Sequence, residues 1–186
     1  MVRITNVVAT ADLGRHLPLP LLEEKLPLAL YTPRKFSGLL ARVLVPFKGH
    51  CQIYANGKIT VNGGKSIEEN EELCKIFVEQ IKACGLDVTC TGYKVVNIIA
   101  SHDFGRRLNL NEIRSLPNAM YEPELFPGLS LRLSDCTAVI FHTGKANLLG
   151  CKTMLELWAA EIELNLFIYS FTFSTHRAMC CTAHQQ

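Results

Sequence analysis

The feature that most constrains this 186-residue chain is an internal repeat. Three blocks of the first half recur in the same order in the second half: NVVATADLGRHLPL (6–19) as NIIASHDFGRRLNL (97–110), ALYTPRKFSGLLARV (29–43) as AMYEPELFPGLSLRL (119–133), and IYANGK (53–58) as IFHTGK (140–145). Three ordered matches are not expected by chance, so the chain contains two homologous units. We predict a first repeat at 3–90, a second at 91–165, and a divergent, poorly ordered C-terminal tail at 166–186.

Each repeat predicts the same series of elements: a strand, a short helix, three further strands and a long helix. Strands are expected at 3–10, 37–45, 50–55 and 58–62 in the first repeat, and at 93–101, 128–134, 136–142 and 145–149 in the second. The short helices are expected at 17–26 and 109–116. Ser66 and Glu69 form a capping box that begins the first long helix, and Gly85 ends it. The second long helix is expected from about Thr153 to Leu164. Side by side, two such repeats predict an α+β fold with one antiparallel sheet, helices on one face and the other face bare.

The composition describes a globular chain and leaves the kind of partner open. It is 48% hydrophobic and 19% charged, with a net charge of only +2. The eight cysteines are scattered, which predicts reduced thiols in an intracellular protein. No signal peptide and no apolar run of about 18 residues is present, so no membrane span is expected.

The titratable residues suggest no active site. The sequence NGGKS lacks the first glycine of a phosphate-binding loop, because Ile59 stands in its place. A zinc cluster of His176, Cys180, Cys181 and His184 has poor ligand spacing. We therefore expect neither an enzyme nor a metal or cofactor.

The bare sheet face should carry both apolar and polar side chains. Val8, Leu40, Thr60 and Ile99 are candidates for it, beside Asn6, Asn97, Arg42 and Arg132. An apolar surface edged with amides and guanidinium groups suits the minor groove of DNA, where A·T pairs offer only acceptors. Lys58 and Lys145 can reach phosphates.

Aromatic residues also recur at matched positions of the two repeats. Phe36 and Phe126 end Pro-containing loops, and Tyr54 and Phe141 precede the hairpin turns. Each of these rings alone is more often a core or loop anchor, but four rings at symmetric positions favour a shared function. Such rings can enter base steps and kink the duplex.

These features together resemble the TATA-box-binding protein family. The resemblance covers residues 3 to about 153 and rests on the repeats, the YEPELFPGL loop (121–129), the NGK and TGK turns and the GKS after the first hairpin. It implies a saddle-shaped fold of about ten strands with four helices on the convex face. It also implies a nuclear protein that binds the minor groove of A·T-rich promoter DNA.

The resemblance also implies roles for particular residues. The wedges would be Phe36, Tyr54, Phe126 and Phe141. The base-edge and groove contacts would be Asn6, Val8, Asn97 and Ile99. The phosphate contacts would be Lys35, Arg42, Lys58, Arg132 and Lys145. Glu122, Glu124 and Leu125 would contact transcription factor IIB, and transcription factor IIA and the RNA polymerase preinitiation complex would be further partners.

Several positions depart from the family pattern. Tyr54 replaces Phe, Asn62 and Leu149 replace Thr, Asn147 replaces a small apolar residue, and Phe47 lies near a basic position. The first long helix is acidic where the family has a basic one. These changes leave an alternative open, in which a related adaptor binds initiation factors but binds TATA DNA weakly.

Overall fold

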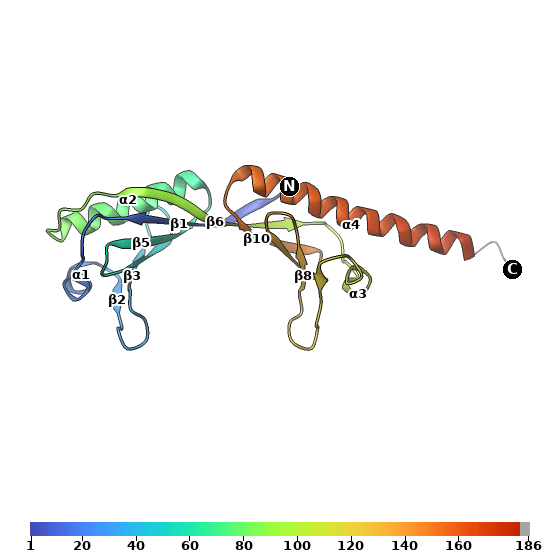
Figure 1. Cartoon of the computed structure of the whole chain (residues 1–186), viewed down its shortest axis with the longest axis horizontal. Helices are drawn as coiled ribbons and strands as arrows, with labels where there is room; N and C mark the ends of the chain where they lie inside the picture. The colour runs from blue at the N-terminus through green and yellow to red at the C-terminus, as the bar shows by residue number, and fades with distance from the viewer. Residues whose placement is uncertain (183–186) are drawn as a thin grey trace. The chain divides into compact units, whose positions relative to one another are not determined.

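The computed structural model describes the backbone of residues 1–182 and the side chains up to Ser170. It divides into two compact units, an N-terminal unit of Ile4–Ile98 and a C-terminal unit of Met1–Arg3 with Ile99–Gln186. Figure 1 shows the elements of each. The predicted repeat boundary lay between residues 90 and 91, whereas the division falls inside strand β6, which therefore contributes to both units.

The N-terminal unit follows the predicted order of elements. Its elements are β1 (Arg3–Asp12), α1 (Leu19–Lys25), β2 (Ala29–Tyr31), β3 (Leu39–Val43), β4 (Gly49–Ile53), β5 (Lys58–Gly64), α2 (Ile67–Ala83) and the first part of β6 (Thr91–Asp103). The hydrogen-bonded strand order is β2-β3-β4-β5-β1-β6. The pairings from β2 through β5 to β1 are antiparallel.

The C-terminal unit repeats this arrangement. It contains the rest of β6, α3 (Leu110–Ile113), β7 (Ala119–Met120), β8 (Leu129–Arg132), β9 (Thr137–Ile140), β10 (Lys145–Cys151) and α4 (Met154–Thr182), with strand order β6-β10-β9-β8-β7. The α+β class with about ten strands and four helices is confirmed. The short strands β2 and β7 fell in none of the predicted ranges, because two or three residues are too few to show a period.

The last helix is longer than predicted. It was expected to end near Leu164 and continues to Thr182, so the segment from 166 is not a separate element. Its poor order stays a prediction. The side chains of the zinc cluster considered above lie outside the described residues. No helix within the described residues is both long and apolar enough to cross a membrane.

Alternating burial along the strands shows which face each helix covers. In β1 the side chains of Val7, Ala9 and Ala11 are buried, and those between them are only half-buried. Ala11 belongs to a buried core cluster that also contains Leu22 of α1 and Phe77 of α2. Burying such a side chain contributes about 1.5–3 kcal/mol, so a one-residue slip of register would be costly. The opposite face is left without a helix, as predicted.

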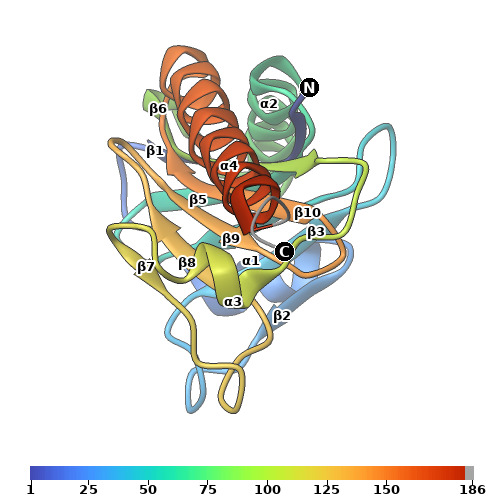
Figure 2. The ribbon, with the colours of Figure 1, turned by 90° about the vertical axis from the view of Figure 1, so that its right-hand side faces the viewer.

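The two long helices begin alike and differ in their outer faces. The Ser66 hydroxyl accepts from Glu69 N at 3.1 Å, which confirms Ser66 as the N-cap of α2, while the Glu69 carboxylate accepts from Lys65 N at 2.8 Å. Thr153 Oγ1 accepts from Glu156 N in the same way at the start of α4, at 3.2 Å. Helix α4 covers the strands of its unit (Figure 2). Its buried residues are Leu157, Ala160, Leu164 and Ile168. Its exposed apolar residues are Leu155, Trp158, Ile162, Leu166 and Tyr169.

Candidate nucleic-acid interface

Each unit carries one pair of aromatic rings with the same geometry. The ring centroids of Phe36 and Tyr54 lie 5.9 Å apart, with 65° between the ring planes. The centroids of Phe126 and Phe141 lie 6.1 Å apart, again at 65°. Edge-to-face packing of this kind stabilises a ring by about 0.5–1.5 kcal/mol beyond its burial. The four predicted wedges therefore form two equivalent pairs, and Phe126 is still 50% exposed.

Two short turns fix the backbone beneath each pair. Lys35 N and Phe36 N both donate to Thr32 O, at 2.9 and 3.0 Å, and Leu125 N and Phe126 N both donate to Glu122 O at 3.0 Å. The hairpin turns also match, since Tyr54 N donates to Lys58 O as Phe141 N donates to Lys145 O, at 3.0 and 2.8 Å. The rings thus stand on backbone geometry that both repeats encode locally.

Glycines make room for the rings. A Cβ atom at Gly38 would lie 2.8 Å from Cε1 of Phe36, and one at Gly128 would lie 2.6 Å from Cε1 of Phe126. Any larger residue would displace the ring that packs over it. The sequence signal was the shared glycine in FSGL and FPGL, which the sequence reasoning did not use.

The Asn6 side chain closes a β-bulge. The β1–β5 register shifts between Val7 and Val8, so Gly63 faces no β1 residue, and its N–H donates to Asn6 Oδ1 at 2.8 Å. That bond orients the amide with its oxygen engaged, which leaves the NH₂ group as the one that can donate to a ligand. Asn6 therefore has a structural role that the sequence did not reveal.

The other predicted groove residues lie on the bare faces of their strands. Val8, Asn97 and Ile99 are half-buried and alternate with the fully buried Val7, Ile98 and Ala100. A half-buried apolar side chain beside amides gives a surface that is partly dehydrated before any ligand arrives.

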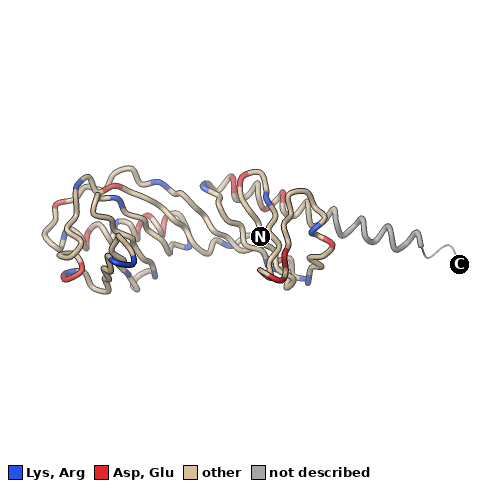
Figure 3. The backbone as a smooth tube through the Cα atoms, turned by 60° about the horizontal axis from the view of Figure 1, so that its bottom comes forward, with Lys and Arg blue, Asp and Glu red and all other residues tan. Residues whose placement is uncertain are grey.

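The predicted phosphate contacts are all exposed and come from both units. They are Lys35, Arg42, Lys58, Arg132 and Lys145. Arg132 Nη1 donates to Thr137 Oγ1 at 3.2 Å, across the β8–β9 pair. Both signs of charge are spread through the two units (Figure 3), which agrees with the small net charge.

The acidic loop of the C-terminal unit also lies open to solvent. Glu122, Glu124 and Leu125 are all exposed, Leu125 by 82%. Because the Glu122 carbonyl oxygen accepts two backbone bonds, the loop holds one shape while its carboxylates stay outside.

Comparisons with known proteins agree with this geometry. The family model described as "Transcription factor TFIID (or TATA-binding protein, TBP)" matches residues 1–84 and 92–164. The chain belongs to this family. A TATA-box-binding protein of Pyrococcus abyssi is 36% identical over 87% of this chain and 86% of its own length. TATA-box-binding protein B of Halobacterium salinarum is 39% identical over 80% of this chain and 83% of its own.

A solved structure gives the same result for the fold. The Methanococcus jannaschii protein of this family matches with a TM-score of 0.81 and 33% identity, over 91% of this chain and 98% of that one. The predicted TATA-binding protein fold is therefore confirmed.

The departures from the TATA-binding protein pattern have distinct structural settings. The Tyr54 hydroxyl donates to Gln52 Oε1 at 3.2 Å, which supplies the partner that the extra oxygen needs. Phe47 packs against the core cluster, so it is a structural residue. Asn62 lies opposite Val8 and His50 on the bare face, and Leu149 lies opposite Thr137.

Sequence reasoning missed two polar residues of the bare face. Gln52 and His50 lie on β4 between the Arg42 strand and β5, on the bare face. Burial, and then the nearby Arg42 guanidinium, lower the pKa of His50 below its ordinary value. Along β4 the apolar residues Cys51 and Ile53 are buried and alternate with His50 and Gln52. This alternation in the sequence could have placed the two polar residues on the bare face.

Proposed function

We propose that this protein is a general transcription initiation factor that binds the minor groove of A·T-rich, TATA-type promoter DNA and bends it. The observation that carries the proposal is the duplicated aromatic pair, with the same spacing and ring angle in both repeats. The shared family and the names of its relatives support the same function. They do not favour an adaptor that lacks TATA binding.

In this proposal the four rings act as wedges. Phe36 and Tyr54 of one unit and Phe126 and Phe141 of the other enter base steps, and unstacking each step costs a few kcal/mol. The contacts made along a bent duplex offset that cost. Because each ring already packs against its partner, little side-chain entropy is lost when it enters the DNA.

The amides read base edges in the groove. The Asn6 NH₂ group donates to N3 or O2 acceptors, and Asn97 acts in the same way in the second repeat. Val8 and Ile99 lie against sugars and the groove floor. A G·C pair would not fit these amides, because the guanine 2-amino group is a hydrogen-bond donor and would face the donating NH₂ groups of Asn6 and Asn97.

The basic side chains contact phosphates and set the salt dependence. Their contribution carries little base information, since every sequence offers the same backbone. Lys58 and Lys145 follow the hairpin turns directly, so each would hold a phosphate next to a wedge.

The YEPEL segment recruits initiation factors. Glu122 and Glu124 are turned to solvent, where phosphates would repel them and a basic protein surface would attract them. We assign transcription factor IIB to this loop, with Leu125 as its apolar anchor, and transcription factor IIA and the polymerase preinitiation complex as further partners. The relatives named above are archaeal, so a nuclear location stays a prediction.

Gel-shift and bending assays on a TATA duplex and a G·C-rich control test the DNA function. Phe126→Ala and Phe141→Ala should each weaken binding to the TATA duplex about 10- to 100-fold and reduce its bend. Trp158→Ala is the matched control, because Trp158 is an exposed ring on α4. Undiminished binding and bending by both wedge variants would refute the assignment.

A ternary-complex assay on preformed protein–DNA complex tests the partner. Glu122→Arg with Glu124→Arg should abolish recruitment of transcription factor IIB while DNA binding survives or strengthens. Unchanged recruitment would remove the loop from the partner interface. Loss of DNA binding would show that the loop had lost its shape.

A further inference from the structure

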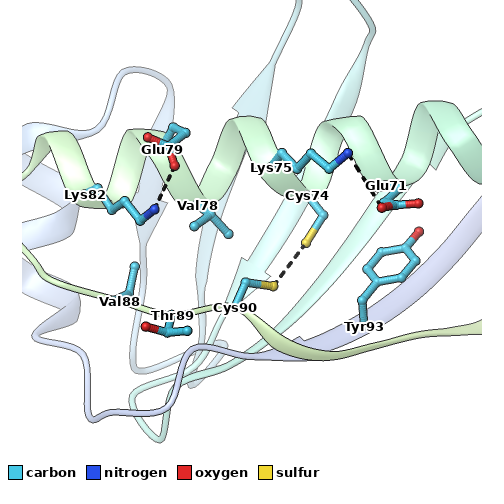
Figure 4. A pocket seen from close by; sticks show the side chains of 10 residues that line it. All are labelled: Glu71, Cys74, Lys75, Val78, Glu79, Lys82, Val88, Thr89, Cys90 and Tyr93. Atoms are coloured by element: carbon cyan, nitrogen blue, oxygen red, sulfur yellow. Dashed lines mark hydrogen bonds and ion pairs between the residues drawn. The ribbon is translucent and has the colours of Figure 1, made fainter.

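A pocket of about 380 Å³ lies on α2, within the N-terminal unit (Figure 4). Cys74 and Val78 of α2 line one side of it, and Val88, Cys90 and Tyr93 line the other. None of the four wedges and none of the proposed groove or phosphate contacts lines this pocket, so the proposed function does not use it.

Two thiols meet in this pocket. The Sγ atoms of Cys74 and Cys90 lie 3.9 Å apart, drawn as a dashed line in Figure 4. Cys74 is buried in α2, and Cys90 is exposed on a segment without regular secondary structure just before β6. A disulfide needs an S–S distance of about 2 Å, and a change of side-chain rotamer with a small backbone shift at Cys90 can provide it.

We propose that Cys74 and Cys90 form a thiol-oxidation site, at which a peroxide converts the pair into a disulfide. The exposed Cys90 thiolate attacks the peroxide, the O–O bond breaks, and Cys90 sulfenic acid and hydroxide form. The hydroxide takes up the proton that Cys90 released on ionisation, which gives water. Cys74 then attacks the Cys90 sulfur, the S–O bond breaks, and the departing hydroxide takes the Cys74 proton. Two thiols and one hydrogen peroxide thus give one disulfide and two waters, with the sulfurs oxidised and the peroxide oxygens reduced.

The burial of Cys74 and the exposure of Cys90 determine which thiol reacts first. Burial, and then the neighbouring Cys90, raise the pKa of Cys74 to about 12, so Cys74 remains protonated at neutral pH. The thiolate is the reactive form of cysteine, and reaction with a dissolved oxidant also needs exposure. Cys90 is therefore the residue that reacts first, and Cys74 resolves the intermediate.

The other described cysteines lack this combination. Cys51, Cys84, Cys136 and Cys151 are all buried, so among the cysteines whose side chains are described Cys90 alone is exposed. Burial, and then the neighbouring Cys151, raise the pKa of Cys136 to about 12. Cys136 and Cys151 are thus a protected pair within the same chain and serve as an internal control.

The disulfide would join α2 to the segment that enters β6. It would close a loop between residues 16 positions apart, which restricts the unfolded chain and stabilises the folded one. It would also narrow the pocket, because Cys74 and Cys90 stand on opposite sides of it.

Peptide mapping of the full-length protein tests the site. The protein is treated with hydrogen peroxide, the remaining thiols are alkylated, and the digest is analysed without reduction. The expected result is a peptide pair linked through Cys74 and Cys90, loss of two hydrogen atoms per chain, a higher Tm, and reversal of all three by a dithiol. Cys136 and Cys151 should be recovered alkylated.

Three variants separate the steps. Cys90→Ser should abolish the linked pair, and Cys74→Ser should leave Cys90 as a sulfenic acid that a cyclic 1,3-dione traps. Cys180→Ser with Cys181→Ser, outside the described side chains, should still form the link. The proposal is overturned if peroxide that oxidises free glutathione leaves Cys74 and Cys90 unlinked, or if Cys90 stays unmodified in Cys74→Ser.

Discussion

The two repeats build the same aromatic pair in surroundings of different polarity. In the N-terminal unit Tyr54 donates to Gln52, whereas Phe141 and Val139 stand at the equivalent positions of the C-terminal unit. The ring spacing differs by only 0.2 Å, from 5.9 to 6.1 Å. The pair geometry therefore does not depend on the hydroxyl–amide bond. It follows from the turns and glycines that the repeats share.

The covering helices of the two units also differ. Helix α2 carries Glu71, Glu72 and Glu79, which pair with Lys75 and Lys82 at its surface. The outer face of α4 is apolar instead. Surface pairs such as these contribute about 0–1 kcal/mol each, so the outer faces can diverge without cost to the fold.

A third difference lies inside the two units. The equivalents Ala11 and His102 are both 6% exposed. His102 packs edge-on against Phe104, with centroids 4.6 Å apart, and its Nδ1 lies 3.3 Å from Glu161 Oε1. Among the histidines whose side chains the structure describes, His102 of the C-terminal unit is the only buried one.

The largest expected effect tests whether the hairpin turns are equivalent. Gly57 and Gly144 have φ values of +90° and +88°, and a Cβ on either would collide with the carbonyl oxygen of Arg15 or Arg106. Gly57→Ala and Gly144→Ala should each lower the free energy of unfolding by about 3 kcal/mol in urea titrations. A large loss in one variant and none in the other would break the equivalence.

The next effect concerns the lysines that follow these turns. Lys58→Ala and Lys145→Ala should each weaken binding to specific and non-specific DNA alike, by about 1 kcal/mol, and reduce the salt slope by about one. Lys75→Ala on α2 is the control and should leave the slope unchanged. A variant with altered sequence preference and an unaltered slope would contradict a phosphate contact.

Exchanging the polar and apolar surroundings of the rings should have a smaller effect. Gln52→Val with Tyr54→Phe gives the N-terminal unit the residues of the C-terminal unit. A double-mutant cycle should measure a coupling of about 1 kcal/mol in the free energy of unfolding, which is typical of one neutral hydrogen bond. DNA bending should remain. Loss of the bend would mean that the bond positions the Tyr54 ring after all.

The smallest expected effect is the pH dependence that His102 adds. Burial, and then the N-terminal ammonium group, lower the pKa of His102, although Glu161 and Asp103 oppose the shift. In the unfolded chain the imidazole takes up its proton near pH 6.5, before it does so in the folded protein. Stability is therefore retained above that pH and lost as the pH falls through it.

Melting curves of the parent and His102→Ala between pH 7.5 and 5.5 measure this contribution. Because the substitution also removes packing against Phe104, the slopes of Tm against pH are compared and not the Tm values. The parent should have the steeper decline. Equal slopes would show that His102 is protonated to the same extent in both states.

Local features of this chain were determined by the sequence itself. The helix cap at Ser66, the Asn56-Gly57 turn and the alternation along β1 all depend on residues a few positions apart. Backbone conformation and burial period over such short stretches are set by the side chains within them, so these predictions needed no tertiary structure. The strands that the sequence analysis missed, β2 and β7, were also missed for a local reason, because they are too short to show an alternation of apolar and polar residues.

The tertiary structure alone decided which distant residues meet. Phe36 packs on Tyr54, Asn6 Oδ1 accepts from Gly63, and Cys90 comes within 3.9 Å of Cys74. Strand register brings Asn6 to its partner across 57 residues, and no spacing in the sequence encodes that contact. Such pairs form only when the whole sheet and its covering helices pack together, because each contact is too weak to offset the entropy of closing its loop alone.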